Sequence, residues 1–556
     1  MKSLLNKKKI AYCKGNLLEV KRIQKDISVQ IIKCKEDYKK KVEKQFRCGN
    51  SRKMWQSLKT MIGCDDKREQ IYTSDAKSFA HDLNTFYSRF DNTDFSKELQ
   101  NVLGSSVITN ATNDIEISVG NVKSCFAKIN VRKASGPDNL PGIVLRSCAD
   151  QLSPIFCKLY QASLDSHKVP TLRKESAVTP VPKKCKPKEL NDYRPVSLTS
   201  VAMKCFERLI LPLLMQNISH ILDPLQFAYR ARRGVEDATL TVLNNLYKHL
   251  ETPKSYARIL FVDFSSAFNT IQPHLLVRKL INMSVNPCLI KWISDFLTNR
   301  TQSVRIKSCQ SSTVTINTGA PQGCVLSPLL FIIYTNDCVA KNSCCSIVKF
   351  ADDAALVALL NDSHEDGYRS EIKNLTHWCQ ENYLQINVKK TKEIIIDLRN
   401  RETSLEPVHV NDNSVEIVSE YKYLGTVIDN KLNWNKNTEN VYKKCQQRLH
   451  FLRKLRCFDV DVKLLKMFYS SFVQITLSFC MQCWYNSLNL QNKNKLIKIV
   501  NVSSKIVGTI LEHPASINEE KTLSHVQKII SDSSHVLFNE YVLLPSGGRF
   551  KVPFLK

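Results

Sequence analysis

The stretch Val348-Lys349-Phe350-Ala351-Asp352-Asp353-Ala354-Ala355-Leu356-Val357 places two adjacent carboxylates between two apolar runs. Neighbouring side chains on one strand point to opposite faces, so both acids can serve one site only where the chain turns. The pattern therefore predicts a β-hairpin with Asp352 and Asp353 at its tip. An Asp-Asp pair alone is more often the polar chemistry of a solvated turn, so a functional interpretation needs a further acid.

A further acid stands upstream. Residues 257–264 (ARILFVDF) form a β-rich apolar run whose only acid is Asp263. A lone carboxylate in a buried strand is costly unless a cation meets it. One strand-borne acid and a hairpin acid pair are the smallest set for holding two Mg²⁺ ions, which can align an attacking 3′-hydroxyl and a departing pyrophosphate. We therefore expect Asp263 to join the hairpin acids in one site.

Length and charge set the broad class. The chain has 556 residues, enough for two to four domains, and its 43% hydrophobic and 24% charged residues are typical of a globular protein. The net charge of +28 favours a polyanionic partner, either nucleic acid or an anionic membrane. No run approaches 18 apolar residues, and residues 1–10 lack the apolar core of a signal peptide. We expect neither a membrane span nor secretion.

The cysteines support an intracellular location. There are 20, scattered and mostly in apolar surroundings, which is typical of reduced thiols in an intracellular protein. Cys480 and Cys483 form a C-x-x-C pair, but no second Cys/His pair follows at finger spacing. Helical packing explains this pair better than a zinc site.

Residues 1–70 carry 20 Lys/Arg against 8 Asp/Glu, with apolar residues at helical spacing. Such a basic helical segment is either a solvated helix face or a nucleic-acid-binding arm, and the sequence leaves both open. Other segments have clearer patterns. We expect helices over 79–90, 201–215, 238–250 and 369–384, strands over 385–397 and 421–429, a loop over 101–118, basic helices over 431–510, and no regular structure over 542–556.

Two extended segments carry cations. Residues 177–184 (AVTPVPKK) are extended by their prolines, and residues 191–198 (NDYRPVSL) hold Arg194 before a proline. Lys183 and Arg194 on neighbouring segments can clamp a triphosphate, because Arg offers a bidentate fork and Lys a point charge. Taken alone, each is an ordinary surface cation.

Two further stretches are candidates for nucleic-acid contact. Residues 226–238 (QFAYRARRGVEDA) interleave aromatic residues with Arg230, Arg232 and Arg233, which suits a base-stacking, backbone-gripping surface. A plain turn before the following helix explains the same residues. Residues 318–329 (TGAPQGCVLSPL) form a Gly/Pro-rich loop entering a helix, where N–H groups can face a phosphate or a base.

Together these blocks resemble the reverse transcriptases of non-LTR (LINE-type) retrotransposons. The blocks that match in order are residues 132–141, 191–198, 261–271, 319–328, 350–353 and 423–425, with looser matches at 77–91 and 480–507. The resemblance implies an α+β right-hand polymerase with fingers, palm and thumb. Its expected parts are a basic helical N-terminal extension (1–118), the first part of the fingers (119–163), the catalytic domain (164–429), a helical thumb-like region (430–510) and a truncated C-terminal tail (511–556).

The resemblance also implies an activity: DNA synthesis on an RNA template from the 3′ end of a DNA primer, with dNTPs and two Mg²⁺ ions. By the same resemblance the protein works in nucleus and cytoplasm as a ribonucleoprotein. The resemblance also implies residue roles. Asp263, Asp352 and the backbone of Phe264 would bind metal, with Asp353 in support, and Lys183 and Arg194 would bind the triphosphate. Gln322 and Gly323 would lie under the templating pair and incoming nucleotide, Phe268 would select the sugar, Lys390 would contact the leaving pyrophosphate, and Tyr423 and Gly425 would contact nucleic acid.

The chain departs from that family in two respects. We find no endonuclease motif before the polymerase blocks, and Ala354 stands where the family more often has Thr. Two other functions compete with reverse transcription. An RNA-dependent RNA polymerase would use the same acids, but Phe268 argues against it. A catalytically silent RNA-binding relic of a retrotransposon would have lost its acids as readily as any other residue, and all three are intact.

Overall fold

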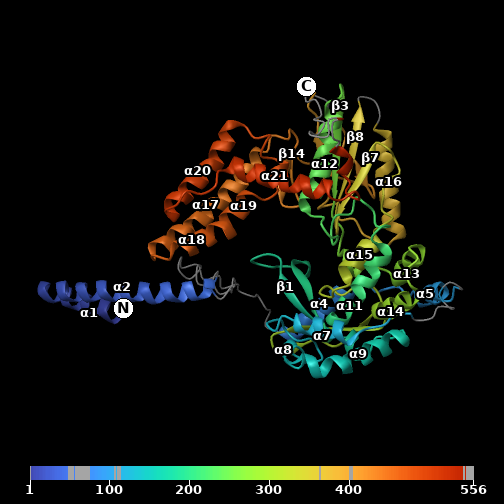
Figure 1. Cartoon of the computed structure of the whole chain (residues 1–556), viewed down its shortest axis with the longest axis horizontal. Helices are drawn as coiled ribbons and strands as arrows, with labels where there is room; N and C mark the ends of the chain where they lie inside the picture. The colour runs from blue at the N-terminus through green and yellow to red at the C-terminus, as the bar shows by residue number, and fades with distance from the viewer. Residues whose placement is uncertain are drawn as a thin grey trace. The chain divides into compact units, whose positions relative to one another are not determined.

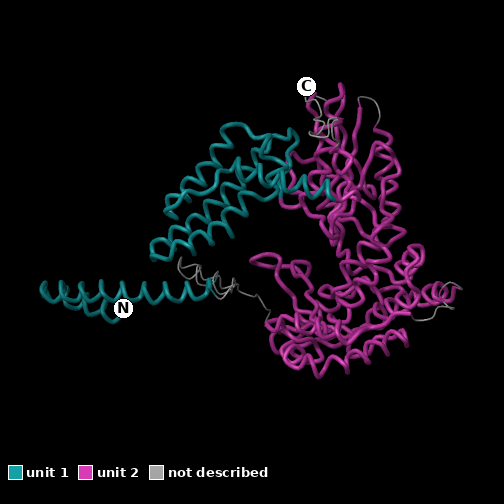
Figure 2. The backbone as a smooth tube through the Cα atoms, in the orientation of Figure 1, with its two compact units in different colours: residues 1–67, 426–531 teal, residues 68–425, 532–556 magenta. Residues whose placement is uncertain are grey.

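The computed structural model describes residues 2–47, 75–105, 114–361, 365–399 and 405–541, together with residues 56, 108 and 545. Over these residues the chain mixes helices and sheets, as the expected α+β class requires. It divides into two compact units (Figure 2). One unit contains residues 1–67 and 426–531, and the other contains residues 68–425 and 532–556.

The larger unit is built around a five-stranded sheet with the order β12-β9-β3-β8-β7 (Figure 1). Its strands are β3 (Ser255–Val262), β7 (Cys345–Phe350), β8 (Asp353–Asn361), β9 (Lys392–Ile396) and β12 (Glu416–Ile417). Every residue of β3 is buried, so both faces of this strand are covered. This explains why its sequence is mostly apolar on both faces rather than alternating between apolar and polar residues.

The predicted hairpin is confirmed. β7 and β8 pair antiparallel, with Phe350 opposite Asp353. The turn between them therefore consists of Ala351 and Asp352, and Ala351 takes the left-handed conformation at a φ of 58°. β3 pairs antiparallel with β8, with Val262 opposite Ala354. The end of β3 and the tip of the hairpin consequently lie at the same end of the sheet.

Helices cover this sheet. α12 (Val235–Leu250) packs against β3, β7 and β8, and α16 (Asp366–Glu381) packs against β7. Both agree with the predicted helices. Arg258, fully buried on β3, donates to both carboxylate oxygens of Glu393 on β9 at 2.9 Å and to Glu365 at 2.7 Å. The buried cation therefore has carboxylate partners that compensate its charge inside the protein.

A second sheet has the order β2-β1-β4-β5, with β6 also paired to β4. Its strands are β1 (Ser176–Pro182), β2 (Tyr193–Leu198), β4 (Arg300–Ile306), β5 (Cys309–Gln310) and β6 (Val314–Ile316). α4 (Ala76–Ser88) begins at the N-cap Asp75 and packs on β4, which confirms the helix predicted near residues 79–90. The remaining helices named below for this unit are α5 (Ser96–Leu103), α9 (Ala149–Asp165), α11 (Val201–Ile218), α13 (Pro273–Asn282), α14 (Pro287–Leu297) and α15 (Ser327–Tyr334).

The smaller unit is almost entirely helical over its described residues, as predicted for residues 1–70 and 431–510. Its main helices are α1 (Lys2–Cys13), α2 (Leu17–Arg47), α17 (Asn435–Cys457), α18 (Val462–Phe468), α20 (Leu490–Val507) and α21 (Pro514–Ile530). α2 contacts the end of α17, where the rings of Tyr38 and Phe458 lie 5.6 Å apart and Lys39 pairs with Asp459 at 3.1 Å. This unit thus joins the N-terminal helices to helices that follow residue 425. Within it, α21 occupies part of the segment expected to be a tail.

The helical stretch Val462–Cys483 is the one candidate, among the described residues, with the length and composition of a membrane span. Half of it is buried inside the protein, and a packed core helix has the same properties. Cys480 and Cys483 lie in this stretch and are buried, which fits the packing interpretation. The expected absence of a membrane span stays a prediction. The C-terminal prediction for residues 542–556 falls outside the described residues, apart from Pro545.

Candidate active site

Three carboxylates gather at one end of the β3-centred sheet. Asp263 directly follows β3, Asp352 lies in the hairpin turn and Asp353 begins β8. Burial raises the pKa of Asp352, and the charge of Asp263 raises it further. Burial and then the charges of Asp352 and Asp263 raise the pKa of Asp353 to about 6. The three acids therefore lie within electrostatic reach of one another, as predicted, and their repulsion favours a bound cation.

The donor set suits a hard cation. No group of three Asp, Glu, His or Cys residues in the described part of the chain forms a ready-made metal cage. Mg²⁺ does not need one, because it is usually held by one or two carboxylates with water and substrate phosphates supplying the other oxygens. Asp263 and Asp352 would supply the carboxylates. The residues present thus fit Mg²⁺ bound together with a nucleotide.

The backbone beyond Asp263 is fixed by the segment before β9. Asn387 donates its N–H to the carbonyl of Asp263 at 2.8 Å, and Ser265 donates to the carbonyl of Gln385 at 2.8 Å. Phe264 lies between these two bonds, opposite Ile386. Neither bond uses the carbonyl of Phe264, which is the backbone group expected to face the metal.

Three cations lie near the acids. β1 and β2 pair antiparallel with Val181 opposite Arg194, which brings Lys183 to the same end of the hairpin as Arg194. Lys183 donates to the carbonyl of Asn191 at 2.6 Å. Burial lowers the pKa of Lys183, and the charges of Lys390 and Arg194 lower it further. The structure therefore brings the two predicted triphosphate ligands together with Lys390, the predicted contact of the leaving pyrophosphate, and each role stays a prediction.

The predicted Gly/Pro-rich loop lies against β2. The N–H of Ser197 donates to the carbonyl of Gln322 at 2.9 Å. A Cβ on Gly323 would lie 2.5 Å from the carbonyl oxygen of Ser197, and the φ of Gly323 is 141°. Glycine is therefore required here, because any side chain would separate the loop from the strand.

Phe268 lies in the turn beyond Asp263, as predicted. Its carbonyl accepts the N–H of Ala320 at 2.8 Å, so this turn and the Gly/Pro-rich loop are bonded directly. The Phe268 ring is half-buried, and its centroid lies 4.9 Å from that of Phe331. The residue is therefore partly accessible while its ring packs against the core. Its role in sugar selection stays a prediction.

Glu207 is a supporting residue that sequence reasoning missed. This fully buried acid on α11 accepts the N–H groups of Val325 at 2.6 Å and Leu326 at 2.9 Å, just before α15. Burial raises its pKa to about 7. The sequence feature that could have indicated this buried acid is its position as the single acid in the apolar helix pattern of residues 201–215.

The sequence pattern indicated residues 226–238 as a candidate surface but did not single out Tyr229 within them. Tyr229 is 52% exposed and has a φ of 57°. Burial raises the pKa of its hydroxyl, and the charge of Asp352 raises it further. The segment around it is tied to the hairpin, since Gln226 Oε1 accepts the N–H of Ala351 at 3.1 Å. An exposed aromatic ring therefore lies within electrostatic reach of the acids.

The three arginines of this segment have different environments. Arg230 donates to the carbonyl of Asp223 at 2.8 Å, and Arg232 is exposed. Arg233 pairs with Asp532 at 2.7 Å, and its side chain is only 4% exposed. This ion pair indicates a structural role for Arg233, in place of the nucleic-acid contact that the sequence suggested. Of the three, Arg232 is placed to meet a phosphate.

Tyr423 and Gly425 were also predicted to contact nucleic acid. Tyr423 is buried, with its ring 5.2 Å from that of Phe261 on β3, and Gly425 has a φ of 99°. Tyr423 therefore supports the sheet beneath the acids instead of forming an exposed surface. Its contribution to binding would be indirect.

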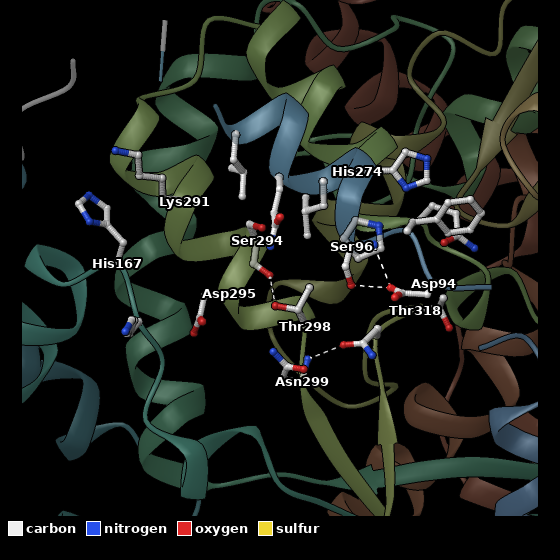
Figure 3. A pocket seen from close by; sticks show the side chains of 18 of the residues that line it. Asp94, Ser96, His167, His274, Lys291, Ser294, Asp295, Thr298, Asn299 and Thr318 are labelled. Atoms are coloured by element: carbon white, nitrogen blue, oxygen red, sulfur yellow. Dashed lines mark hydrogen bonds between the residues drawn. The ribbon is translucent and has the colours of Figure 1, made fainter. Parts of the chain in front are cut away.

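A cavity of about 390 Å³ lies between α5, α13 and α14 (Figure 3), and none of the three acids lines it. Asp94, His274, Lys291 and Thr318 are among its lining residues. Chemistry and charge, rather than cavity size, therefore identify the active site.

Three acids at one end of the sheet, with three cations nearby, fit a two-metal site for phosphoryl transfer, the chemistry of nucleic-acid polymerases among other enzymes. Comparison with known proteins agrees: residues 181–428 match the family described as reverse transcriptase (RNA-dependent DNA polymerase). The chain therefore carries a reverse transcriptase domain, and the resemblance to the non-LTR retrotransposon enzymes is confirmed. A separate match covers residues 434–474, to the N-terminal region of alkylated DNA repair protein alkB homolog 8.

Similar proteins carry consistent names. The probable RNA-directed DNA polymerase from transposon BS of Drosophila melanogaster is 25% identical over 74% of this chain and 48% of that protein. The RNA-directed DNA polymerase from mobile element jockey of the same fly is 27% identical over 58% of this chain and 36% of that protein. The retrovirus-related Pol polyprotein from type-1 retrotransposable element R1 of Bradysia coprophila is 22% identical over 69% and 38%. The chain spans about half or less of the length of these curated relatives.

Proposed function

We propose that this chain is an RNA-directed DNA polymerase that copies RNA into DNA from a 3′-hydroxyl primer by two-metal phosphoryl transfer. The observation that carries the proposal is the position of the acids: Asp263, Asp352 and Asp353 lie within the matched domain and meet at one end of its sheet. Its partners are an RNA template, a DNA primer and dNTPs. The protein acts inside the cell, in nucleus and cytoplasm, as a ribonucleoprotein.

The proposed architecture is a right hand. The β3-centred sheet would be the palm, the β1–β2 hairpin and the helices around the second sheet would be the fingers, and α17 to α20 would be the thumb. The basic helices α1 and α2 would extend it at the N-terminus. The net charge of +28 supports a polyanionic substrate held by such a hand.

The protein groups have distinct roles in this proposal. Asp263 and Asp352 hold the metal, the carbonyl of Phe264 completes its protein ligands, and Asp353 supports them through its charge. Two Mg²⁺ ions would activate the primer hydroxyl and stabilise the leaving pyrophosphate. Catalysis by the protein is then mainly positioning and charge neutralisation.

The cations neutralise the triphosphate. Lys183 and Arg194 face its charged oxygens from the β1–β2 hairpin, and Lys390 faces the departing pyrophosphate. Arg can bind two oxygens at once, whereas each Lys acts as a point charge. Burial lowers the pKa of Lys183, and the charges of Lys390 and Arg194 lower it further; a bound triphosphate would relieve the repulsion among the cations.

The test is primer extension by the purified full chain on an RNA template with a DNA primer, dNTPs and Mg²⁺. We expect extension that stops without Mg²⁺ and in an Asp352→Asn variant. A parallel reaction with rNTPs tests the RNA-polymerase alternative, which would give the faster extension there. RNA binding without extension in either reaction would instead support a silent RNA-binding protein.

A further inference from the structure

Arg89 follows α4 and reaches the turn that carries Phe268. Its guanidinium carbon lies 3.8 Å from the ring centroid of Phe86 and 4.2 Å from that of Phe90. Two aromatic contacts of this kind restrain a long side chain to one direction. From that position Nη2 of Arg89 donates to the hydroxyl of Ser266 at 3.2 Å.

Ser266 is a strained point in the turn between Asp263 and Phe268. It has a φ of 54°, a left-handed conformation that is unfavourable for serine. Within the turn, the N–H of Asn269 donates to the carbonyl of Ser266 at 2.7 Å. A strained turn persists only when its surroundings fix it, and the contact with Arg89 is one such restraint.

The same segment also holds the Gly/Pro-rich loop. The carboxylate oxygens of Asp91 accept the N–H of Asn317 at 3.1 and 3.2 Å, two residues before Gly319. That loop is bonded in turn to the residues beyond Ser266, since Gly319 donates to the carbonyl of Ile271 at 2.7 Å. Arg89 and Asp91 therefore hold the two loops on which the incoming nucleotide would rest.

Polar contacts are important here because two cavities border this segment. Asn92, Thr93 and Phe95 line a cavity of about 240 Å³. The larger cavity of about 390 Å³ begins at Thr93, and Figure 3 shows Asp94 and Thr318 on its wall. A segment with empty volume behind it lacks the dense side-chain contacts that normally fix a position.

We propose that Arg89 is a positioning residue for the incoming nucleotide: through Ser266 it holds the turn between Asp263 and Phe268 in the conformation that the nucleotide requires. The proposal rests on the polymerase function proposed above. It predicts that loss of Arg89 weakens nucleotide binding and sugar choice more than it slows the chemical step, because Arg89 itself touches neither metal nor substrate.

The first measurement needs no enzymatic activity. Amide hydrogen exchange is followed in the full chain for peptides covering residues 263–271, in wild type, Arg89→Gln and Ser266→Ala. Both variants should exchange about five- to tenfold faster in this turn, since opening it no longer breaks a charge-assisted hydrogen bond. The matched control is Arg399→Gln, which removes another stacked arginine, 4.4 Å from the ring of Tyr256 at the far end of β3. It should leave the turn unchanged.

The second measurement is steady-state primer extension. Arg89→Gln and Ser266→Ala should each raise KM for the dNTP by about three- to tenfold and lower the preference for dNTPs over rNTPs, with kcat changed less. The double variant should resemble either single variant, because both remove the same contact. Arg89→Lys, which can still donate one hydrogen bond, should recover part of the loss.

The two measurements separate the possible failures. If wild type does not extend primers, the polymerase proposal fails and hydrogen exchange still decides whether Arg89 fixes the turn. If wild type extends primers but the Arg89→Gln and Ser266→Ala variants keep wild-type KM, sugar preference and exchange, the positioning role is refuted. An equal fall in kcat with both sugars, matched by a lower melting temperature, would mean that Arg89 only stabilises the fold.

Discussion

The carboxylate of Asp263 and the ammonium of Lys390 meet at the end of the β3-centred sheet, with Oδ1 and Nζ 3.4 Å apart. This contact supplies the cation that an acid at the end of a buried strand requires. Burial lowers the pKa of Lys183, and the charge of Lys390 lowers it further. Lys390 therefore lies within electrostatic reach of both Asp263 and Lys183, where a leaving pyrophosphate would meet it.

We expect Lys390→Gln to lower kcat/KM for dNTPs about 10- to 100-fold, the scale of one charge-assisted contact. Primer extension at varied dNTP concentration measures the effect. The neighbouring Lys389→Gln is the control, because Lys389 is also an exposed lysine. Similar kinetics in the two variants would remove Lys390 from the site.

Asp352→Asn should lower the extension rate by roughly 10²–10³ or more, the scale seen when one electrostatic stabiliser is removed. RNA binding should change little, since it depends on the basic surface. Filter binding and single-turnover extension measure the two effects separately. Extension at a near wild-type rate by this variant would exclude Asp352 as a metal ligand.

Asp353 gives the metal-free protein a characteristic pH dependence. Its pKa of about 6 in the folded protein lies above its usual value of 3.8, so ionisation opposes folding. Stability should fall as pH rises from about 4 to 6, and Asp353→Asn should remove that loss. In EDTA, the melting temperature of the variant should therefore exceed that of wild type above pH 6 and match it below pH 4. A difference that is independent of pH would contradict the burial and repulsion described above.

Local patterns predicted much of this fold. The acid pair between two apolar runs correctly predicted the hairpin, and the apolar residues before Asp263 correctly predicted a buried strand. Apolar spacing also predicted α12 and α16 within a few residues. These features depend on near neighbours, because side-chain periodicity and turn chemistry act over a few residues.

Contacts distant in sequence could not be predicted in the same way. Arg233 pairs with Asp532, 299 residues away, which no charge pattern in residues 226–238 indicates. Glu207 reaches Val325 over 118 residues, and Arg89 reaches Ser266 over 177 residues. Such pairs are set by tertiary packing, so a sequence shows the donor or acceptor without its partner.

The basic helix α2 tests whether the N-terminal charge surplus binds nucleic acid. Lys21, Lys25 and Lys33 are exposed on it. If they contact phosphates, replacing all three by Gln should weaken RNA binding and make the slope of log K against log salt shallower by about two to three. Binding measured between about 50 and 200 mM salt gives that slope. An unchanged slope would show that α2 is only a solvated face.

Phe268 decides whether the site selects its sugar by steric exclusion. The ring lies five residues beyond Asp263 and packs against Phe331. If the turn passes beneath the ribose, the accessible part of the ring occupies the space that a 2′-hydroxyl needs. Selection then comes from a clash with ribonucleotides rather than from better contacts to deoxyribonucleotides.

Phe268→Val should consequently keep most dNTP use and raise ribonucleotide incorporation, with about 1.4 kcal/mol of lost discrimination for each tenfold change. A purely packing phenylalanine would behave differently. Its loss would lower stability and reduce incorporation of both sugars equally, because the cavity beside Phe331 would disturb the whole turn. Phe331→Leu is the matched control, since it weakens the same packing without changing the ring that faces the nucleotide. Incorporation of dNTPs and rNTPs, measured at equal folded fraction, separates the two roles: an unchanged ratio in Phe268→Val means that the ring packs and does not select.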